Sequence, residues 1–146
     1  MAENLLIGCL MMTACVAIQC VVVALLLRVV PYLERKGVIR LTVVHAVWLL
    51  TSVLLIMFAG NLLQIAAWAG VLLGLGEFGD FATAFYHSMV NFTTLGYGDL
   101  VMSEKHRLLG ALEAANGVLM FGLTTGVLFA LMQALIRRSS QAHTRG

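Results

Sequence analysis

The chain has 146 residues, of which 61% are hydrophobic and 11% are charged, and its formal net charge is +2 at pH 7. Its mean hydropathy of +0.97 is far too high for a soluble domain. The apolar residues occur in runs long enough to cross a bilayer, so we expect one membrane domain. Anionic lipid accounts for the small excess of basic residues, and we expect no nucleic-acid partner.

Three apolar runs are candidates for membrane-spanning helices. The first, residues 5–30, is long enough at about 1.5 Å per residue to cross roughly 30 Å of hydrocarbon. The polar segment 31–37, which begins at the single proline, predicts a turn after this helix. The second run covers residues 41–75 and the third covers 108–136, which leaves 137–146 as a polar tail that is too short to fold alone.

A shorter segment lies between the second and third runs. Asp80 is a good N-cap for a helix over residues 81–92. About a dozen residues are too few to span a membrane, and this length is typical of a re-entrant helix. The preceding residues 74–79 spell Gly-x-Gly-x-x-Gly, but no strand or βαβ unit surrounds them, so we interpret them as a flexible linker.

The sequence that follows, Thr-Thr-Leu-Gly-Tyr-Gly-Asp at residues 93–99, resembles the selectivity filter of potassium channels. In such filters, backbone carbonyls replace the hydration shell of the ion. Gly96 and Gly98 tolerate the positive φ angles that this arrangement needs, whereas a bare Gly-x-Gly would indicate only a turn. The resemblance implies that K⁺ is coordinated by Thr94, Leu95, Gly96, Tyr97 and Gly98, with Leu95 standing where Val or Ile is commoner.

The third run contains a segment, residues 117–125, that resembles the inner helix of bacterial two-transmembrane potassium channels. The resemblance implies a hinge at Gly117 and a water-filled cavity beside the helix. The residues that would face this cavity are Val118, Phe121 and Thr125, and their i, i+3, i+7 spacing independently places them on one helix face. Gly122 and Gly126 form a small-xxx-small pair, so helix packing explains the glycines as well as a hinge does.

Many potassium channels brace the filter aspartate with an acidic residue on the re-entrant helix, but Val90 stands at that position here. Glu113 lies within the third run, where a charge costs about 2.5–3.5 kcal/mol and calls for a partner such as His87 or Asn61. We hypothesise that Glu113 and His87 replace the brace and make the filter sensitive to pH; an unrelated structural hydrogen bond is the alternative. The expected filter-support residues are Tyr86, His87, Thr93, Asp99 and Glu113.

The distribution of charge predicts an orientation. Seven of the nine basic residues lie in segments 28–40 and 137–146, so the positive-inside rule places both segments in the cytoplasm. The N-terminus and the filter mouth would then lie outside a cell membrane that the chain crosses several times. Five of the seven acidic residues fall on this outer side, where they would concentrate cations.

We therefore expect an all-α membrane protein with three transmembrane helices plus a re-entrant pore helix and filter loop. One chain supplies one filter strand, so a closed pore needs a C4 tetramer. The expected parts are an N-terminal helix and cytoplasmic loop (1–40), a pore domain (41–136, with outer helix 41–75, pore helix 81–92, filter 94–98 and inner helix 108–136) and a cytoplasmic tail (137–146).

The predicted function is passive, potassium-selective conduction by a homotetramer in the lipid bilayer. Potassium is the permeant ligand; we expect no cofactor and no enzymatic activity. Two alternatives remain open, namely a weakly selective cation channel of the same architecture and a non-conducting membrane regulatory subunit.

Overall fold

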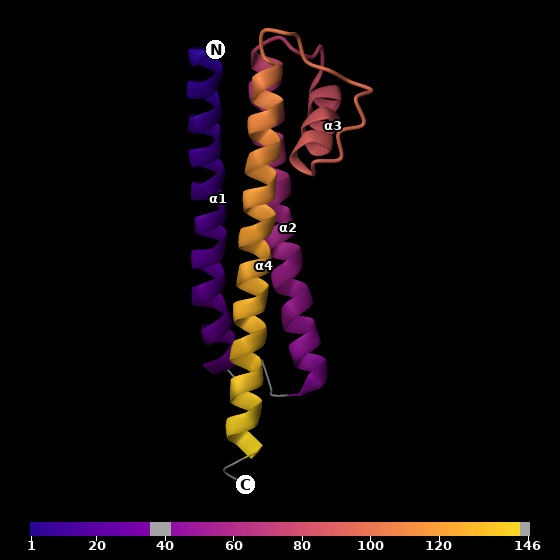
Figure 1. Ribbon diagram of the computed structural model, residues 1–146. Helices are drawn as coiled ribbons and strands as arrows, with labels where there is room; N and C mark the ends of the chain where they lie inside the picture. The colour runs from indigo at the N-terminus through magenta and orange to yellow at the C-terminus, as the bar shows by residue number, and fades with distance from the viewer. Residues whose placement is uncertain (36–41, 144–146) are drawn as a thin grey trace.

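The computed structural model describes residues 1–35 and 42–143. This part of the chain folds into four α-helices and contains no strand. They are α1 (Ala2–Arg35), α2 (Val43–Gly74), α3 (Phe81–Phe92) and α4 (Arg107–His143). Figure 1 shows α1, α2 and α4 side by side as a long bundle, with the N- and C-termini at opposite ends and α3 beside the end that carries the N-terminus. The all-helical prediction is confirmed.

The three long helices each contain a segment that is long and apolar enough to cross a membrane. These segments are Ala2–Tyr32, Val44–Gly74 and Arg107–Arg137. Many of their apolar side chains are exposed in the chain, which is the pattern of helices that face hydrocarbon rather than water. The chain is therefore a multi-pass membrane protein, as its hydropathy predicts.

Two helices are longer than the sequence predicts. Helix α1 continues through Pro31 to Arg35, so the turn expected to begin at this proline is wrong. Proline has a φ angle close to the helical value, and the backbone hydrogen bond that it removes lies near the end of the helix. Helix α4 continues to His143, so most of the expected polar tail is helical. Extending a helix that already exists avoids the cost of nucleation, and Arg and Gln are good helix formers.

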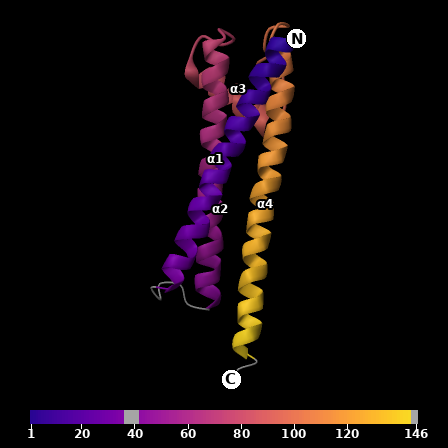
Figure 2. The same ribbon diagram turned by 90° about the vertical axis from the view of Figure 1, so that its left-hand side faces the viewer.

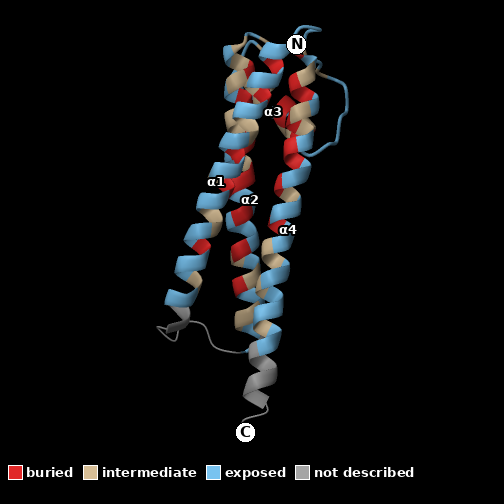
Figure 3. Cartoon of the chain, turned by 60° about the vertical axis from the view of Figure 1, so that its left-hand side comes forward, coloured by how far each residue is buried: buried red, intermediate tan, exposed pale blue. Residues whose placement is uncertain are grey.

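The larger hydrophobic core lies at the end of the bundle that holds α3. It combines one side chain from each helix, among others: Cys15 of α1, Trp68 of α2, Phe92 of α3 and Leu109 of α4. Figure 3 shows the buried residues concentrated in this half of the bundle. A smaller cluster around Met57 joins α1 and α2 nearer the other end. The bundle thus packs most of its interior around α3.

Buried polar side chains tie α1 to the rest of the bundle. The Nε2 of Gln64 on α2 donates to Gln19 Oε1 on α1 at 2.7 Å, and Gln19 Nε2 lies 3.4 Å from Thr124 Oγ1 on α4. Near the N-terminus, Asn4 Nδ2 donates to the carbonyl of Lys105 at 2.6 Å. Helix α1 therefore packs against α2 and α4 of its own chain, an arrangement that the sequence leaves open.

Candidate ion-conduction site

Helix α3 begins where the sequence predicts. The Asp80 carboxylate accepts hydrogen bonds from the Thr83 backbone nitrogen at 2.9 Å and from the Thr83 hydroxyl at 2.6 Å. The hydroxyl and then the amide hold the pKa of Asp80 below its ordinary value. The capping prediction is confirmed, and the helix covers residues 81–92 as expected.

The C-terminal end of α3 is fixed against α4. The Phe92 side chain is completely buried, and its ring packs edge-on against Phe121 with 5.8 Å between the centroids. The helices approach so closely here that a Cβ on Gly117 would lie 1.8 Å from the Phe92 carbonyl oxygen. Close packing thus requires glycine at position 117. At Gly122 and Gly126 a Cβ would meet no atom of the described chain within 4 Å, so these two glycines mediate no close contact within it.

The chain turns back immediately after α3. The Thr93 hydroxyl donates to the Met89 carbonyl at 2.8 Å, and the Leu95 amide donates to the Val90 carbonyl at 2.9 Å. These bonds satisfy carbonyl groups that the last turn of a helix leaves without intrahelical partners. The first residues of the expected filter are therefore held under the end of α3.

The backbone of the filter segment alternates in conformation. The φ angles of Thr94, Gly96 and Gly98 are +61°, +59° and +72°, which places every second residue in the left-handed region. Glycine adopts this region freely, but a β-branched threonine does so rarely and at an energetic cost. Leu95 and Tyr97, which lie between these positions, are not in this region.

The filter segment has an uncovered surface. All five residues from 94 to 98 are exposed in the chain, with Leu95 54% and Tyr97 68% accessible. Figure 1 shows the loop that follows α3 running along the outside of the bundle, back to the end at which α3 began. One chain therefore supplies the backbone of this segment without enclosing it.

A hydrogen bond joins α3 to the residue just beyond the filter. Tyr86 Oη donates to Asp99 Oδ2 at 2.8 Å. This bond raises the pKa of the Tyr86 hydroxyl and lowers the pKa of the Asp99 carboxyl. Val90, at the position of the absent acidic brace, is buried. Val90 has no polar side-chain group that could bind Asp99. Tyr86, one of the expected support residues, contacts this aspartate instead.

Glu113 does not form the pair expected of it. The side chain is completely buried, and neither carboxylate oxygen accepts a hydrogen bond from the described residues. His87 instead contacts the Asn91 amide at 3.3 Å and the Phe78 ring at 4.7 Å between centroids. The structure thus joins Glu113 to neither His87 nor Asn61. Further buried polar atoms without a partner in the described chain lie on Asn61, Gln64, Trp68, Ser88, His106 and Asn116.

Reasoning from the sequence missed a polar cluster around Glu77. The Glu77 carboxylate accepts hydrogen bonds from the Ser103 amide and hydroxyl, both at 2.7 Å, and pairs with His106 Nδ1 at 2.5 Å. Burial alone raises the pKa of Glu77, but the bonds from Ser103 and His106 outweigh it and leave the pKa below its ordinary value. Segment 74–79 is therefore more than the linker we expected, because it fastens the end of α2 to the chain entering α4. A carboxylate next to a glycine turn and a Ser-x-x-His ahead of α4 were the available signals.

The three residues expected to face a cavity lie on α4 with different surroundings. Val118 is 58% accessible, and Thr125 is exposed with its hydroxyl donating to the Phe121 carbonyl at 2.9 Å. Phe121 is half-buried against Phe92. Val118 and Thr125 are thus uncovered within the chain, and their place in a cavity stays a prediction.

Ion-channel pore proteins combine membrane-length helices with a short helix and a loop that returns to the same end of the bundle, as this chain does. A family model described as "Ion channel" matches residues 43–134, which is more than half of the chain and includes α2, α3 and the filter segment. The chain therefore belongs to this ion-channel family, and the family resemblance drawn from the filter is confirmed. No curated protein and no solved structure gives a significant match. All of α1 precedes the matched region.

Proposed function

We propose that four copies of this chain form a potassium-selective channel that conducts passively along their common axis. Family membership establishes an ion channel; the selectivity for K⁺ and the tetramer are the proposal. The ion would be coordinated by backbone carbonyls, with the Thr94 hydroxyl adding oxygens at the inner end. The coordinating residues would be Thr94, Leu95, Gly96, Tyr97 and Gly98.

The observation that carries this proposal is the alternating backbone of the filter segment. The common β-turns need no residue with positive φ, one, or two adjacent ones, whereas Thr94, Gly96 and Gly98 have positive φ at every second position. Such alternation turns successive carbonyls to one side, where they can replace the hydration shell of a cation without a fixed charge that would trap it. A left-handed threonine is strained, and local strain of this kind is typical of functional segments.

The exposed filter surface supports a symmetric assembly. The carbonyl groups of one strand surround an ion only when symmetry-related strands complete the ring, and cyclic symmetry closes such a ring. Val118 and Thr125 leave a further uncovered face on α4 that can line the axis below the filter. The C-terminal end of α3 carries the negative end of its dipole, which favours a cation held near it.

The orientation is also part of the proposal. The cytoplasm would hold the ends of α1 and α4 that carry most of the basic residues, and the filter mouth would face outward. Asp99, Glu77 and Asp80 would then lie on the outer side, where their negative charge raises the local concentration of cations.

Ion flux through proteoliposomes tests the function. We expect a K⁺/Na⁺ bi-ionic reversal potential that follows the potassium gradient, block by barium, and a tetramer in native mass spectra. Gly96→Ala should abolish selective flux, because alanine in the left-handed region costs about 1–2 kcal/mol. Gly79→Ala is the matched control, since position 79 lies outside the filter, has no positive φ and leaves open space for a Cβ.

Three results would contradict the proposal. A bi-ionic reversal potential near zero would indicate a weakly selective cation channel of the same architecture. A tetramer without flux would indicate a non-conducting regulatory subunit. A monomer or dimer as the conducting species would exclude a ring of carbonyls built from identical strands.

A further inference from the structure

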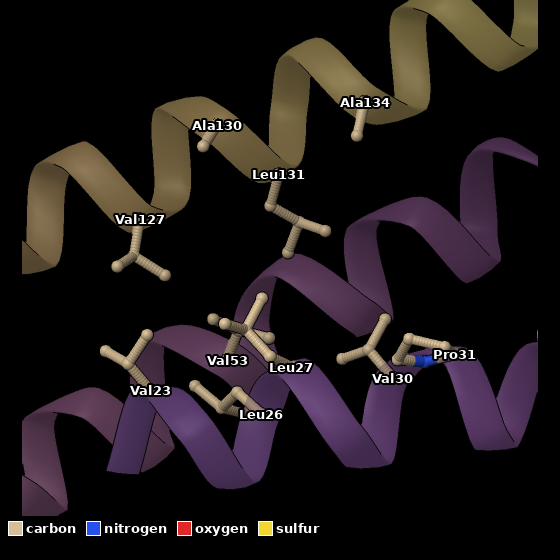
Figure 4. A pocket seen from close by; sticks show the side chains of 10 residues that line it. All are labelled: Val23, Leu26, Leu27, Val30, Pro31, Val53, Val127, Ala130, Leu131 and Ala134. Atoms are coloured by element: carbon tan, nitrogen blue, oxygen red, sulfur yellow. The ribbon is translucent and has the colours of Figure 1, made fainter. Parts of the chain in front are cut away.

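An apolar groove lies between α1, α2 and α4 in the half of the bundle away from α3. Its volume is about 260 Å³, and every side chain that lines it is a hydrocarbon. Figure 4 shows side chains of α1 and α4 pointing toward one another across the groove, with Val53 of α2 behind them. All of the lining residues belong to the membrane-spanning segments, so the groove lies at the depth of lipid tails.

The helix sequences explain the groove. On α4, the small residues Ala130 and Ala134 stand one turn apart and leave space that larger side chains would fill. Figure 2 shows α1 and α4 diverging toward this end of the bundle. Leu27 of α1 is 71% accessible and both alanines are exposed, so the groove is open on one side. The gap is thus continuous with the surroundings of the bundle.

The chemistry of the lining selects the occupant. A site without polar groups gives water no hydrogen-bond partners, and a dry apolar cavity of about 150 Å³ is already large enough to take up benzene. A groove of 260 Å³ therefore accommodates several methylene groups of a chain. Because the groove opens sideways into hydrocarbon, a lipid acyl chain reaches it without crossing a polar layer.

A basic residue lies just beyond the groove on α4. Arg137 continues the α4 stripe of Ala130 and Ala134 by one further turn. Its side chain is exposed and forms no ion pair within the described chain. In the sequence, segments 28–41 and 137–146 hold seven basic residues and one acidic residue. Long arginine side chains extend from this depth to the interface and attract anionic head groups.

We propose that this groove binds one acyl chain of an anionic phospholipid, whose phosphate is held by Arg137. Half of the residues that line the groove belong to α1, which lies entirely outside the region matched by the ion-channel family. The groove gives the first helix a role as one wall of a lipid site. The inference rests on the membrane location of the chain and is independent of ion selectivity.

Native mass spectrometry of the full-length protein, extracted in mild detergent and incubated with phosphatidylglycerol or phosphatidylcholine of equal chain length, tests the site. We expect wild-type protein to retain phosphatidylglycerol in preference to phosphatidylcholine. Ala130→Trp and Ala134→Trp fill the groove and should remove most of the retained lipid. Ala24→Trp is the matched control, because Ala24 is exposed on α1 at the same level but does not line the groove, and it should retain wild-type lipid.

A second variant tests the head group without filling the groove. Arg137→Gln should lower phosphatidylglycerol retention about five-fold, since one basic residue contributes about 1 kcal/mol to such binding, and should leave phosphatidylcholine unchanged. Unchanged lipid retention in both tryptophan variants would overturn the proposal. The proposal would also be overturned if the two tryptophan variants dissociated the assembly and Ala24→Trp did not. That result would show that the groove holds a second copy of the chain. If neither tryptophan variant folds, the comparison of wild type with Arg137→Gln decides. The proposal is then overturned if each of these two proteins retains phosphatidylglycerol and phosphatidylcholine equally.

Discussion

Tyr86 Oη lies 2.8 Å from Asp99 Oδ2 and donates a hydrogen bond to it. The two residues are thirteen positions apart, one within α3 and the other just after the filter segment. The bond therefore ties the returning strand to the helix that precedes it. Since Val90 cannot brace Asp99, this contact is the polar link between α3 and the aspartate in the described chain.

Removing the Tyr86 hydroxyl should weaken the filter without altering the packing of the ring. We expect Tyr86→Phe to reduce the K⁺/Na⁺ permeability ratio, because the strand that carries Asp99 loses its anchor. The bi-ionic reversal potential measures this ratio. In a double-mutant cycle, Tyr86→Phe should have little further effect on the permeability ratio in an Asp99→Ala background, since the bond is already absent there. Fully additive effects would show that the bond has no role in selectivity.

We expect the same bond to affect the response of the proposed filter mouth to acid. The bond lowers the pKa of Asp99 below the ordinary value of 3.8. The carboxylate therefore stays charged at pH 3.8 and loses its charge only when the pH falls through the lowered pKa. In Tyr86→Phe this pKa should return toward 3.8. We therefore expect the acid-induced loss of inward current to occur at higher pH in the variant than in wild type. Titration of the external solution during recording measures the midpoint, and identical midpoints would contradict the prediction.

Features encoded by neighbouring residues could be predicted from the sequence. The bounds of α3 follow from Asp80 as a cap and from the length of the amphipathic segment. The order of residues 93–99 marks the segment that we propose as the filter. The contacts of Tyr86 with Asp99 and of Glu77 with His106 could not be predicted, because they depend on how the chain returns after α3. Only the tertiary fold brings these pairs together.

The helix ends were predicted poorly for a different reason. We expected α1 to end before Pro31 and α4 to end at residue 136, because polarity and proline were used as stop signals. Backbone hydrogen bonding does not depend on hydropathy, so both helices extend beyond their apolar runs. The surroundings of Glu113 could not be predicted either, because Glu113 lies on α4 and its polar neighbours Ser88 and Asn91 lie on α3.

Gly117 should be the least replaceable glycine of α4. In Gly117→Ala the new Cβ would lie 1.8 Å from the backbone oxygen of Phe92, so α3 and α4 would have to separate. Overpacking of this kind costs typically about 1–3 kcal/mol, and backbone atoms relax less easily than side chains. We expect a lower melting temperature in detergent and loss of flux. Gly122→Ala is the control, because a Cβ at position 122 would have no described atom of the same chain within 4 Å. Equal thermal stability of Gly117→Ala and wild type would show that α3 does not pack on α4 as described.

Gln19 should contribute to the docking of α1 through its buried side chain. It accepts a hydrogen bond from Gln64 at 2.7 Å, and Gly60 leaves room for it, since a Cβ there would lie 2.9 Å from Gln19 Oε1. Gln19→Leu keeps the volume but leaves the Gln64 amide without this partner. Interhelical hydrogen bonds within membranes contribute about 0.6 kcal/mol on average and at most about 1.7 kcal/mol.

We therefore expect Gln19→Leu to lower the melting temperature of the purified protein in detergent and to increase proteolysis between α1 and α2. The same substitution at Gln133, which is exposed on α4, is the matched control and should leave both measurements unchanged. A Gln19→Leu variant as stable as Gln133→Leu would mean that apolar packing alone holds α1 in place. A larger loss in Gln19→Leu, reproduced by Gln64→Leu and not increased in the double variant, would assign the stabilisation to this hydrogen bond.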